Sequence, residues 1–252
     1  MKTSKVKIVW LLISCFILSV LGGCKSSDTN PADINIGCMK GPTAIGMIQL
    51  ISSSSEGYAI NNYTPTIAGT ADEISTGLIN GTLDIAAVPC NLASVLYNKT
   101  EGEIVTAAIN TLGVLYIIET GEAVSSVNDL KGKTIYSTGQ GATPEYTLRY
   151  LLTSAGLNPD TDVTIEYKSE APEVVAALTQ NPEAAAMLPQ PYVTAAATSN
   201  PTWRIALDVT AEWEALNEGT IVTGVIVARR SFIEENPQAF ANFLTEYEAS
   251  TT

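Results

Sequence analysis

Four turns of this sequence combine glycine or proline with side chains that can hydrogen-bond a small molecule. The first is Lys40-Gly41-Pro42-Thr43, between an expected strand over 34–38 and an expected helix over 43–51. Such a turn places backbone N–H groups and the positive end of a helix dipole beside whatever it holds, which favours carboxylate, sulfonate or carbonyl oxygens. The chemistry predicted for this turn is therefore reversible binding.

The other three turns, at 89–91, 138–144 and 189–192, also follow expected strands. Each of the four turns, taken alone, is equally well explained as an ordinary turn. In that case Thr43 and Thr143 would be helix N-caps, and Asn91 would be a cap or a ligand contact. Four turns at strand ends favour a binding cleft, because ligands settle outside the carboxyl ends of strands in open α/β sheets. The residues predicted to bind a ligand are Lys40, Gly41, Pro42, Thr43, Asn91, Gly141, Ala142, Thr143, Gln190 and Tyr192.

Several kinds of chemistry are excluded by composition and spacing. The chain has no histidine, which excludes Ser-His-Asp and Cys-His nucleophile pairs and removes the usual ligand of catalytic zinc. Gly41-Pro42-Thr43 lacks the Lys-Ser/Thr of a phosphate-binding loop, and Gly139-Gln140-Gly141 is followed by Pro144 where a dinucleotide motif has its third glycine. The acidic pairs Asp72/Glu73, Glu101/Glu103 and Glu234/Glu235 lack the spacing of a calcium loop, and most are expected at helix starts or in polar turns. No metal and no cofactor are expected.

The first 23 residues are typical of a secretory signal peptide. Lys2, Lys5 and Lys7 precede an apolar run of 14 residues, shorter than the ~20 of a spanning helix. Small residues then precede Cys24, a pattern similar to the bacterial lipobox, in which this cysteine carries the lipid. The alternative is a non-lipidated signal or an uncleaved anchor. Residues 24–32 are polar and predict a lipidated tether.

The net charge of the mature chain makes nucleic acid an improbable partner. Of 13 basic residues the leader removes three, which leaves ten against 26 acidic ones, a net charge of −16. Nucleic acid is therefore not an expected partner.

Cys38 and Cys90 both stand at ends of expected strands. An exported location permits a disulfide between them, but two buried free thiols are favoured.

From residue 33 onward, strands and helices alternate, which predicts an α/β fold of mainly parallel sheets flanked by helices. A long β-prone run over 104–119 is expected to cross between two halves, so that two half-sites form a hinged clamp. The expected strands cover 34–38, 58–67, 83–88, 104–119, 133–137, 162–168, 184–188, 204–209 and 220–229. The expected helical segments cover 43–51, 70–81, 92–97, 127–130, 143–155, 171–179, 192–198 and 232–247.

The chain resembles solute-binding lipoproteins of ABC importers, in the type II periplasmic-binding-protein group near the nitrate, sulfonate, taurine and thiamine-pyrimidine-precursor binders. The resemblance covers about 34–250. Its motifs are the lipobox, KGPTAIGM (40–47), INGTLDIAAVP (79–89), NDLKGKTI (128–135), GATPEYTLRYLL (141–152) and LPQPYV (188–193).

The resemblance implies two lobes with hinge strands between them, lobe 1 over 33–115 plus 222–252 and lobe 2 over 116–221. It implies a lipid-anchored (palmitate-carrying), monomeric protein outside the bacterial cytoplasmic membrane or in the periplasm, which delivers a solute to an ABC permease without catalysis. Because Lys40 is the only basic residue in the nominated turns, a neutral or singly anionic ligand is expected, with a flat ring against Tyr192. Family members continue for several helices, so the chain is expected to be truncated and lobe 1 incomplete.

Two alternatives share the fold. One is a solute-sensing domain. The other is an enzyme such as a thiamine-pyrimidine synthase, which is disfavoured because that type relies on histidine.

Overall fold

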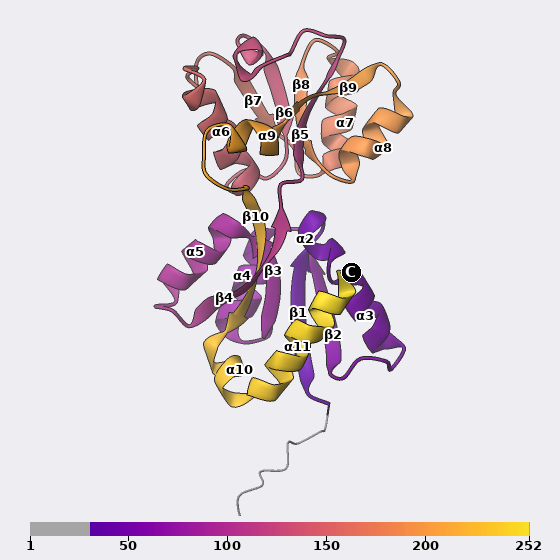
Figure 1. The fold of residues 1–252 in the computed structure, drawn as a ribbon, viewed down its shortest axis with the longest axis vertical. Helices are drawn as coiled ribbons and strands as arrows, with labels where there is room; N and C mark the ends of the chain where they lie inside the picture. Colours follow the sequence, from indigo (N-terminus) through magenta and orange to yellow (C-terminus); the bar gives the residue numbers. More distant parts are fainter. Residues whose placement is uncertain (1–30, 252) are drawn as a thin grey trace, which may run out of the picture. The chain divides into compact units, whose positions relative to one another are not determined.

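Two five-stranded sheets organise residues 31–251, the part of the chain that this computed structural model describes (Figure 1). The predicted signal peptide, the lipid-bearing Cys24 and nearly all of the predicted tether lie outside these residues. Within 31–251, none of the helices combines the length and the apolar character needed to cross a bilayer.

Sheet A has the strand order β2-β1-β3-β10-β4. Its strands are β1 (Asp33–Met39), β2 (Asn62–Ala68), β3 (Ile85–Pro89), β4 (Ile104–Leu112) and β10 (Val222–Arg229). The helices around it are α2 (Pro42–Ile45), α3 (Ile48–Ser55), α4 (Ala71–Asn80), α5 (Cys90–Lys99), α10 (Arg230–Glu235) and α11 (Pro237–Ser250).

Sheet B has the order β7-β6-β8-β5-β9. Its strands are β5 (Leu115–Thr120), β6 (Thr134–Ser137), β7 (Thr164–Tyr167), β8 (Ala185–Pro189) and β9 (Trp203–Asp208). Its helices are η1 (Val127–Leu130), α6 (Thr143–Ser154), α7 (Ala171–Gln180), α8 (Tyr192–Ser199) and α9 (Val209–Glu214).

Both sheets are mainly parallel, as the sequence predicts, and each contains one antiparallel strand. In sheet A, β1 pairs in parallel with β2 and β3, whereas β10 is antiparallel to β3 and β4. In sheet B, β6 is parallel to β7 and β8, and β5 is antiparallel to β8 and β9. The reason is connectivity, because each sheet contains one strand that enters from the other: β10 in sheet A and β5 in sheet B.

Apolar side chains fill both faces of each sheet. On one face of sheet A, Ile34 and Ile36 of β1 pack with Leu50 of α3 and Phe243 of α11; on the other, Ile74 belongs to a cluster with residues of α4 and α5. Sheet B is covered by α6 and η1 on one face and by α7 and α8 on the other. Burial on both faces explains why β3, with Ile85–Val88 completely buried, is a continuous apolar run.

The predicted helix over 232–247 is wrong in one respect, because it is two helices. Pro237 begins α11 and Asn236 separates it from α10. Proline lacks the N–H group that a continuous helix requires, but it fits the first turn of a new one. Glu234 and Glu235 therefore end α10 instead of beginning a helix.

The predicted long strand over 104–119 is likewise interrupted. β4 ends at Leu112 and β5 begins at Leu115, with Gly113 at φ 60° and Val114 at φ 81° between them. Left-handed backbone is costly for a β-branched residue, by about 1–3 kcal/mol, and such strain is held where surrounding structure imposes it. The run does pass from one sheet to the other, as expected, and it turns at Gly113-Val114. The division of the chain into lobes at 115/116 and 221/222 stays a prediction.

Candidate ligand-binding cleft

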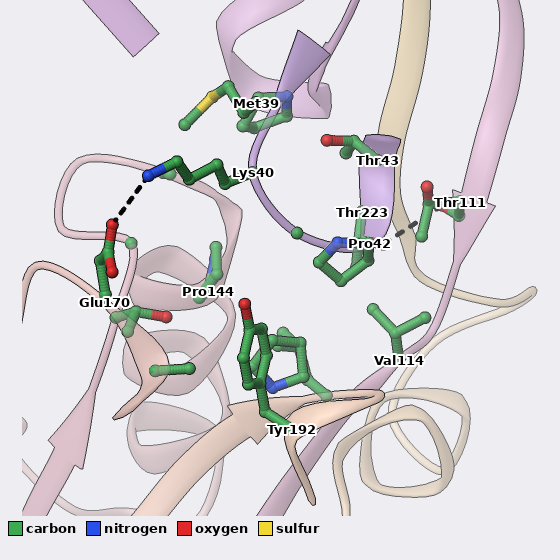
Figure 2. A pocket seen from close by; sticks show the side chains of 18 of the residues that line it. Met39, Lys40, Pro42, Thr43, Thr111, Val114, Pro144, Glu170, Tyr192 and Thr223 are labelled. Carbon is green, nitrogen blue, oxygen red and sulfur yellow. Dashed lines mark hydrogen bonds and ion pairs between the residues drawn. The ribbon is translucent and has the colours of Figure 1, made fainter. Parts of the chain in front are cut away.

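A cavity of about 210 Å³ lies between the two sheets (Figure 2). The turns that follow β1, β2 and β3 line it from sheet A, and the turns that follow β6, β7 and β8 line it from sheet B. The residues around it are Met39, Lys40, Gly41, Pro42, Thr43, Gly69, Pro89, Thr111, Val114, Leu115, Thr138, Gly139, Ala142, Pro144, Ser169, Glu170, Ala171, Pro189, Tyr192 and Thr223.

The sheet topology explains why these distant segments meet. β1, β2 and β3 are parallel, so their carboxyl ends reach one edge of sheet A; β6, β7 and β8 do the same in sheet B. The crossing segments add Thr111, Val114, Leu115 and Thr223 at the same level. The cavity is therefore bounded by strand ends and helix starts of both sheets, as expected for a ligand site in open α/β sheets.

Hydrogen bonds tie the turn after β1 to the crossing strands. The Asn110 Nδ2 donates to the carbonyl oxygen of Thr43 at 3.0 Å, and the Thr111 hydroxyl donates to Asn110 Oδ1 at 3.0 Å. From β10, the Thr223 hydroxyl donates to the Thr111 carbonyl at 3.2 Å. The wall that carries Pro42 and Thr43 is thus fixed to the two strands that join the sheets.

One ion pair crosses the cleft. Lys40 Nζ, from the turn after β1, lies 3.4 Å from Glu170 Oε1, at the start of α7 (Figure 2). Their side chains are 61% and 56% exposed. A pair this exposed contributes little to stability, about 0–1 kcal/mol, but it balances the only formal charges among the residues that line the cavity.

A second contact between the sheets involves Asn91. Its Nδ2 donates to the carbonyl oxygen of Gly141 at 3.0 Å, and its Oδ1 accepts from the Thr143 hydroxyl at 3.1 Å. Asn91 belongs to α5 beside sheet A, whereas Gly141 and Thr143 stand at the start of α6 beside sheet B. The amide of Asn91 therefore uses both its donor and its acceptor to hold the two sides together.

Comparisons with known proteins identify the type of protein to which this cleft belongs. A family model described as "ABC transporter, phosphonate, periplasmic substrate-binding protein" matches residues 62–251, about three quarters of the chain. The chain belongs to this family. It is a periplasmic substrate-binding component of an ABC import system, which confirms the resemblance found in the sequence. No curated protein matches it.

Solved structures similar to this substrate-binding protein include the aliphatic sulphonate binding protein SsuA of Escherichia coli, with 19% identity, a TM-score of 0.70, and coverage of 88% of this chain and 73% of that one. An ABC transporter structure from Parabacteroides distasonis has 22% identity, a TM-score of 0.67, and coverage of 87% and 72%. The alkanesulfonate-binding SsuA of Xanthomonas axonopodis pv. citri, bound to MOPS, has 19% identity, a TM-score of 0.65, and coverage of 88% and 73%. At these identities the likeness shows the fold, and it confirms the predicted two-lobe α/β architecture.

Six of the ten residues predicted to bind ligand line the cavity of this substrate-binding protein: Lys40, Gly41, Pro42, Thr43, Ala142 and Tyr192. The ring of Tyr192 points into it (Figure 2). The other four are Asn91, Gly141, Thr143 and Gln190. The first three make the contact between the lobes described above. Gln190 lies just before α8, and its side chain accepts a hydrogen bond from the Thr194 hydroxyl of that helix at 2.9 Å.

Thr43 and Thr143 are not the helix N-caps that the alternative explanation requires. The N-cap positions of α2 and α6 are Gly41 and Ala142, and neither provides a side-chain hydrogen bond. Thr143 is the first residue of α6, and its hydroxyl is used by Asn91.

Sequence reasoning missed the turn after β7, which contributes Ser169, Glu170 and Ala171. The sequence did indicate it, because a strand over 162–168 and a helix from Ala171 were both expected. The turn between them therefore follows a strand and precedes a helix, as the other four turns do. It also missed Pro89 and Pro189, which end the equivalent strands β3 and β8.

The two cysteines of the described chain are free thiols, so the disulfide alternative is not formed. Cys38 is buried in β1 and Cys90 is half-buried at the start of α5. Burial raises the pKa of the Cys38 thiol above its ordinary value, which keeps it protonated and unreactive. Within 31–251, no group of three or more Cys, Asp or Glu side chains is placed to hold a metal ion.

Proposed function

We propose that this protein captures a small organic molecule or anion between two hinged lobes and delivers it to the membrane permease of its ABC importer. The lobes comprise residues 33–115 with 222–252, and residues 116–221. The observation that carries the proposal is the cavity, because turns from both sheets line it and the chain crosses from one half to the other in the segments between β4 and β5 and between α9 and β10. Closing of one lobe on the other would enclose the solute, as in other hinged binding proteins.

The residues proposed to contact the solute are Lys40, Gly41, Pro42, Thr43, Ala142 and Tyr192. Asn91, Gly141 and Thr143 act by joining the lobes, and Gln190 positions the start of α8. The ligand is a neutral or singly anionic small molecule with a flat ring that packs against Tyr192. The phosphonate of the family description and the sulfonates of the similar structures are candidate classes to be tested alongside uncharged compounds.

We infer that the protein is a monomer held by a lipid on Cys24 at the outer face of the bacterial cytoplasmic membrane, or in the periplasm, and that it catalyses no reaction. The basic start, the apolar run and the small residues before Cys24 support the lipid anchor. Incorporation of labelled palmitate that is lost in Cys24→Ala would support it further.

Ligand capture is tested by a thermal-shift and calorimetry screen of the protein from Lys25 onward, with phosphonates, sulfonates, nitrate, thiamine pyrimidines and neutral ring compounds. A ligand present at about a hundred times its Kd stabilises the folded state by about 2.7 kcal/mol, a shift of several degrees. Ala142→Trp should abolish the response because Ala142 lines the cavity. Ala195→Trp, exposed on α8, is the matched control. A response that survives Ala142→Trp would exclude the cleft as the binding site.

A further inference from the structure

The charges that face the cleft come from two residues, one on each side. Lys40 is the only Lys or Arg among the residues that line the cavity, and Glu170 is their only Asp or Glu. The two lie 3.4 Å apart, so the ammonium group of Lys40 already has an anionic partner. Lys40 is therefore not a free cation waiting for an anionic ligand, although its position in the sequence indicates that role.

We propose that Glu170 is a specificity-determining residue, which makes the cleft select an uncharged, partly apolar solute over the phosphonates named in the family description. The inference rests on the proposed function, since it concerns the ligand of the same cleft. Glu170 opposes a phosphonate in two ways: it occupies the ammonium group of Lys40, and its carboxylate repels a second negative charge.

The helices that begin around the cavity have fewer backbone N–H groups for binding an anion than the number of helices indicates. Anions at helix N-termini are held by the backbone N–H groups of the first turn. Pro42 and Pro144 stand in the first turns of α2 and α6, as Pro172 does in α7, and proline has no N–H group. Each of these first turns has therefore lost a donor that a phosphonate or sulfonate would use.

Two further carboxylates act on the same helix starts. Glu145, in the first turn of α6, accepts from the Gly141 N–H at 2.7 Å, and Glu173, in the first turn of α7, accepts from the Ser169 N–H at 2.9 Å. Each carboxylate takes up a backbone donor just before its helix, of which Ser169 lines the cavity, and offsets the positive end of its helix dipole. These two helix starts therefore offer a dianion less positive potential than they would without the carboxylates.

What remains around the cavity suits a neutral molecule. Most of the lining is apolar, with Met39, Val114, Leu115 and four prolines. The polar groups include hydroxyls, such as those of Thr43, Thr138, Ser169 and Tyr192, which can donate or accept a hydrogen bond. Flat proline faces and the Tyr192 ring favour an apolar or aromatic group, and the hydroxyls orient its polar atoms.

The test compares phenylphosphonate with benzamide, two ring compounds of similar size that differ in charge. Calorimetry at mildly alkaline pH measures both against wild-type protein, Glu170→Gln and the control Glu166→Gln. Glu166 is a matched control because it is an exposed glutamate two residues before Lys168, to which it pairs at 3.0 Å, and it lies outside the cavity lining. We expect Glu170→Gln to bind phenylphosphonate about tenfold or more tightly than wild type, because the substitution frees Lys40 and removes a like charge.

Glu166→Gln should bind phenylphosphonate as wild type does, and the affinity for benzamide should be the same in all three proteins. In Glu170→Gln, but not in wild type, added salt should weaken phenylphosphonate binding. Equal phenylphosphonate affinity in wild type and Glu170→Gln, including no binding in either, overturns the role of Glu170. Failure of the proposed function is a separate result, since it would be seen as ligand responses that Ala142→Trp does not change.

Discussion

Removing the Asn91 side chain should open the cleft without unfolding either half of the protein. In Asn91→Ala both hydrogen bonds of the Asn91 side chain are lost, the one to the Gly141 carbonyl at 3.0 Å and the one from the Thr143 hydroxyl at 3.1 Å. A hydrogen bond of this kind contributes about 0.5–1.5 kcal/mol, so the closed form loses about 1–3 kcal/mol relative to the open form. That corresponds to a shift of about 5–150-fold in the closing equilibrium.

Small-angle X-ray scattering of the unliganded protein measures the opening directly, as an increase in radius of gyration. Asn98→Ala is the matched control, because Asn98 lies on the same helix and donates only to the Ser94 carbonyl of that helix, at 2.8 Å. The double variant Asn91→Ala with Thr143→Ala should open no further than Asn91→Ala, since the bond between these two side chains is already lost. It should bind the ligand found in the screen more weakly than wild type and remain folded.

The melting temperature of the Asn91→Ala variant provides the second readout. Neither hydrogen bond belongs to the core of a sheet, so unfolding of each lobe should be nearly unaffected. A wild-type radius of gyration together with wild-type ligand affinity in Asn91→Ala would refute the argument that these hydrogen bonds hold the lobes closed. A large fall in melting temperature would show instead that Asn91 stabilises the fold of its own lobe.

Three other predictions concern the cleft wall, the C-terminal helix and pH. Tyr192→Ala should weaken binding of the screen ligand at least about tenfold by calorimetry, and Tyr192→Phe less, if ring packing dominates. Ser250→Ala should lower the free energy of unfolding in urea by about 1–2 kcal/mol, because the Ser250 hydroxyl donates to the Gly46 carbonyl at 2.6 Å and accepts from the Leu50 N–H at 3.2 Å; Thr251→Ala is the control. Hydrogen bonds from the Ser125 N–H, the Ser126 hydroxyl and the Ser126 N–H lower the pKa of the Asp129 carboxyl below its ordinary value. The contribution of Asp129 to folding stability is therefore present above the unfolded-state pKa and lost as pH falls through the folded-state pKa. Wild type should therefore melt above Asp129→Asn at neutral pH, and the difference should vanish in acid.

The order of strands and helices could be predicted because hydrophobic runs and turn residues alternate clearly. The breaks inside long segments could not be placed, for different physical reasons. The run over 104–119 is β-prone throughout, and only the need to pass from one sheet to the other explains the left-handed backbone at Val114. The break at Pro237 did have a local signal, since a proline inside an expected helix ends it at the preceding residue.

The cleft could be predicted as a set of turns but not as a set of contacts. The rule that ligands lie at the carboxyl ends of parallel strands identifies the turns after β1, β3, β6 and β8 from sequence alone. It cannot tell which side chains meet across the gap. Asn91 and Thr143 are 52 positions apart and Lys40 and Glu170 are 130 apart, and each pair meets only because the two halves face each other.

The two halves are built alike, and this likeness explains where the charges of the cleft lie. β1, β2 and β3 hold the same places in sheet A that β6, β7 and β8 hold in sheet B, and β10 and β5 are the strands that enter from the opposite side. Lys40 follows β1, whereas Glu170 follows β7, which is the counterpart of β2. The two charges thus stand at different turns of similar lobes and face each other across the gap.

Separating the lobes would leave a cation on one lobe and an anion on the other, and water would solvate each of them. Closure brings the charges together and leaves the lining of the cavity without net charge, so that an unpaired charge on the enclosed ligand would find no partner there. Selectivity for charge should therefore arise in the closing step more than in the first encounter, and it should be measured as a difference in dissociation rate.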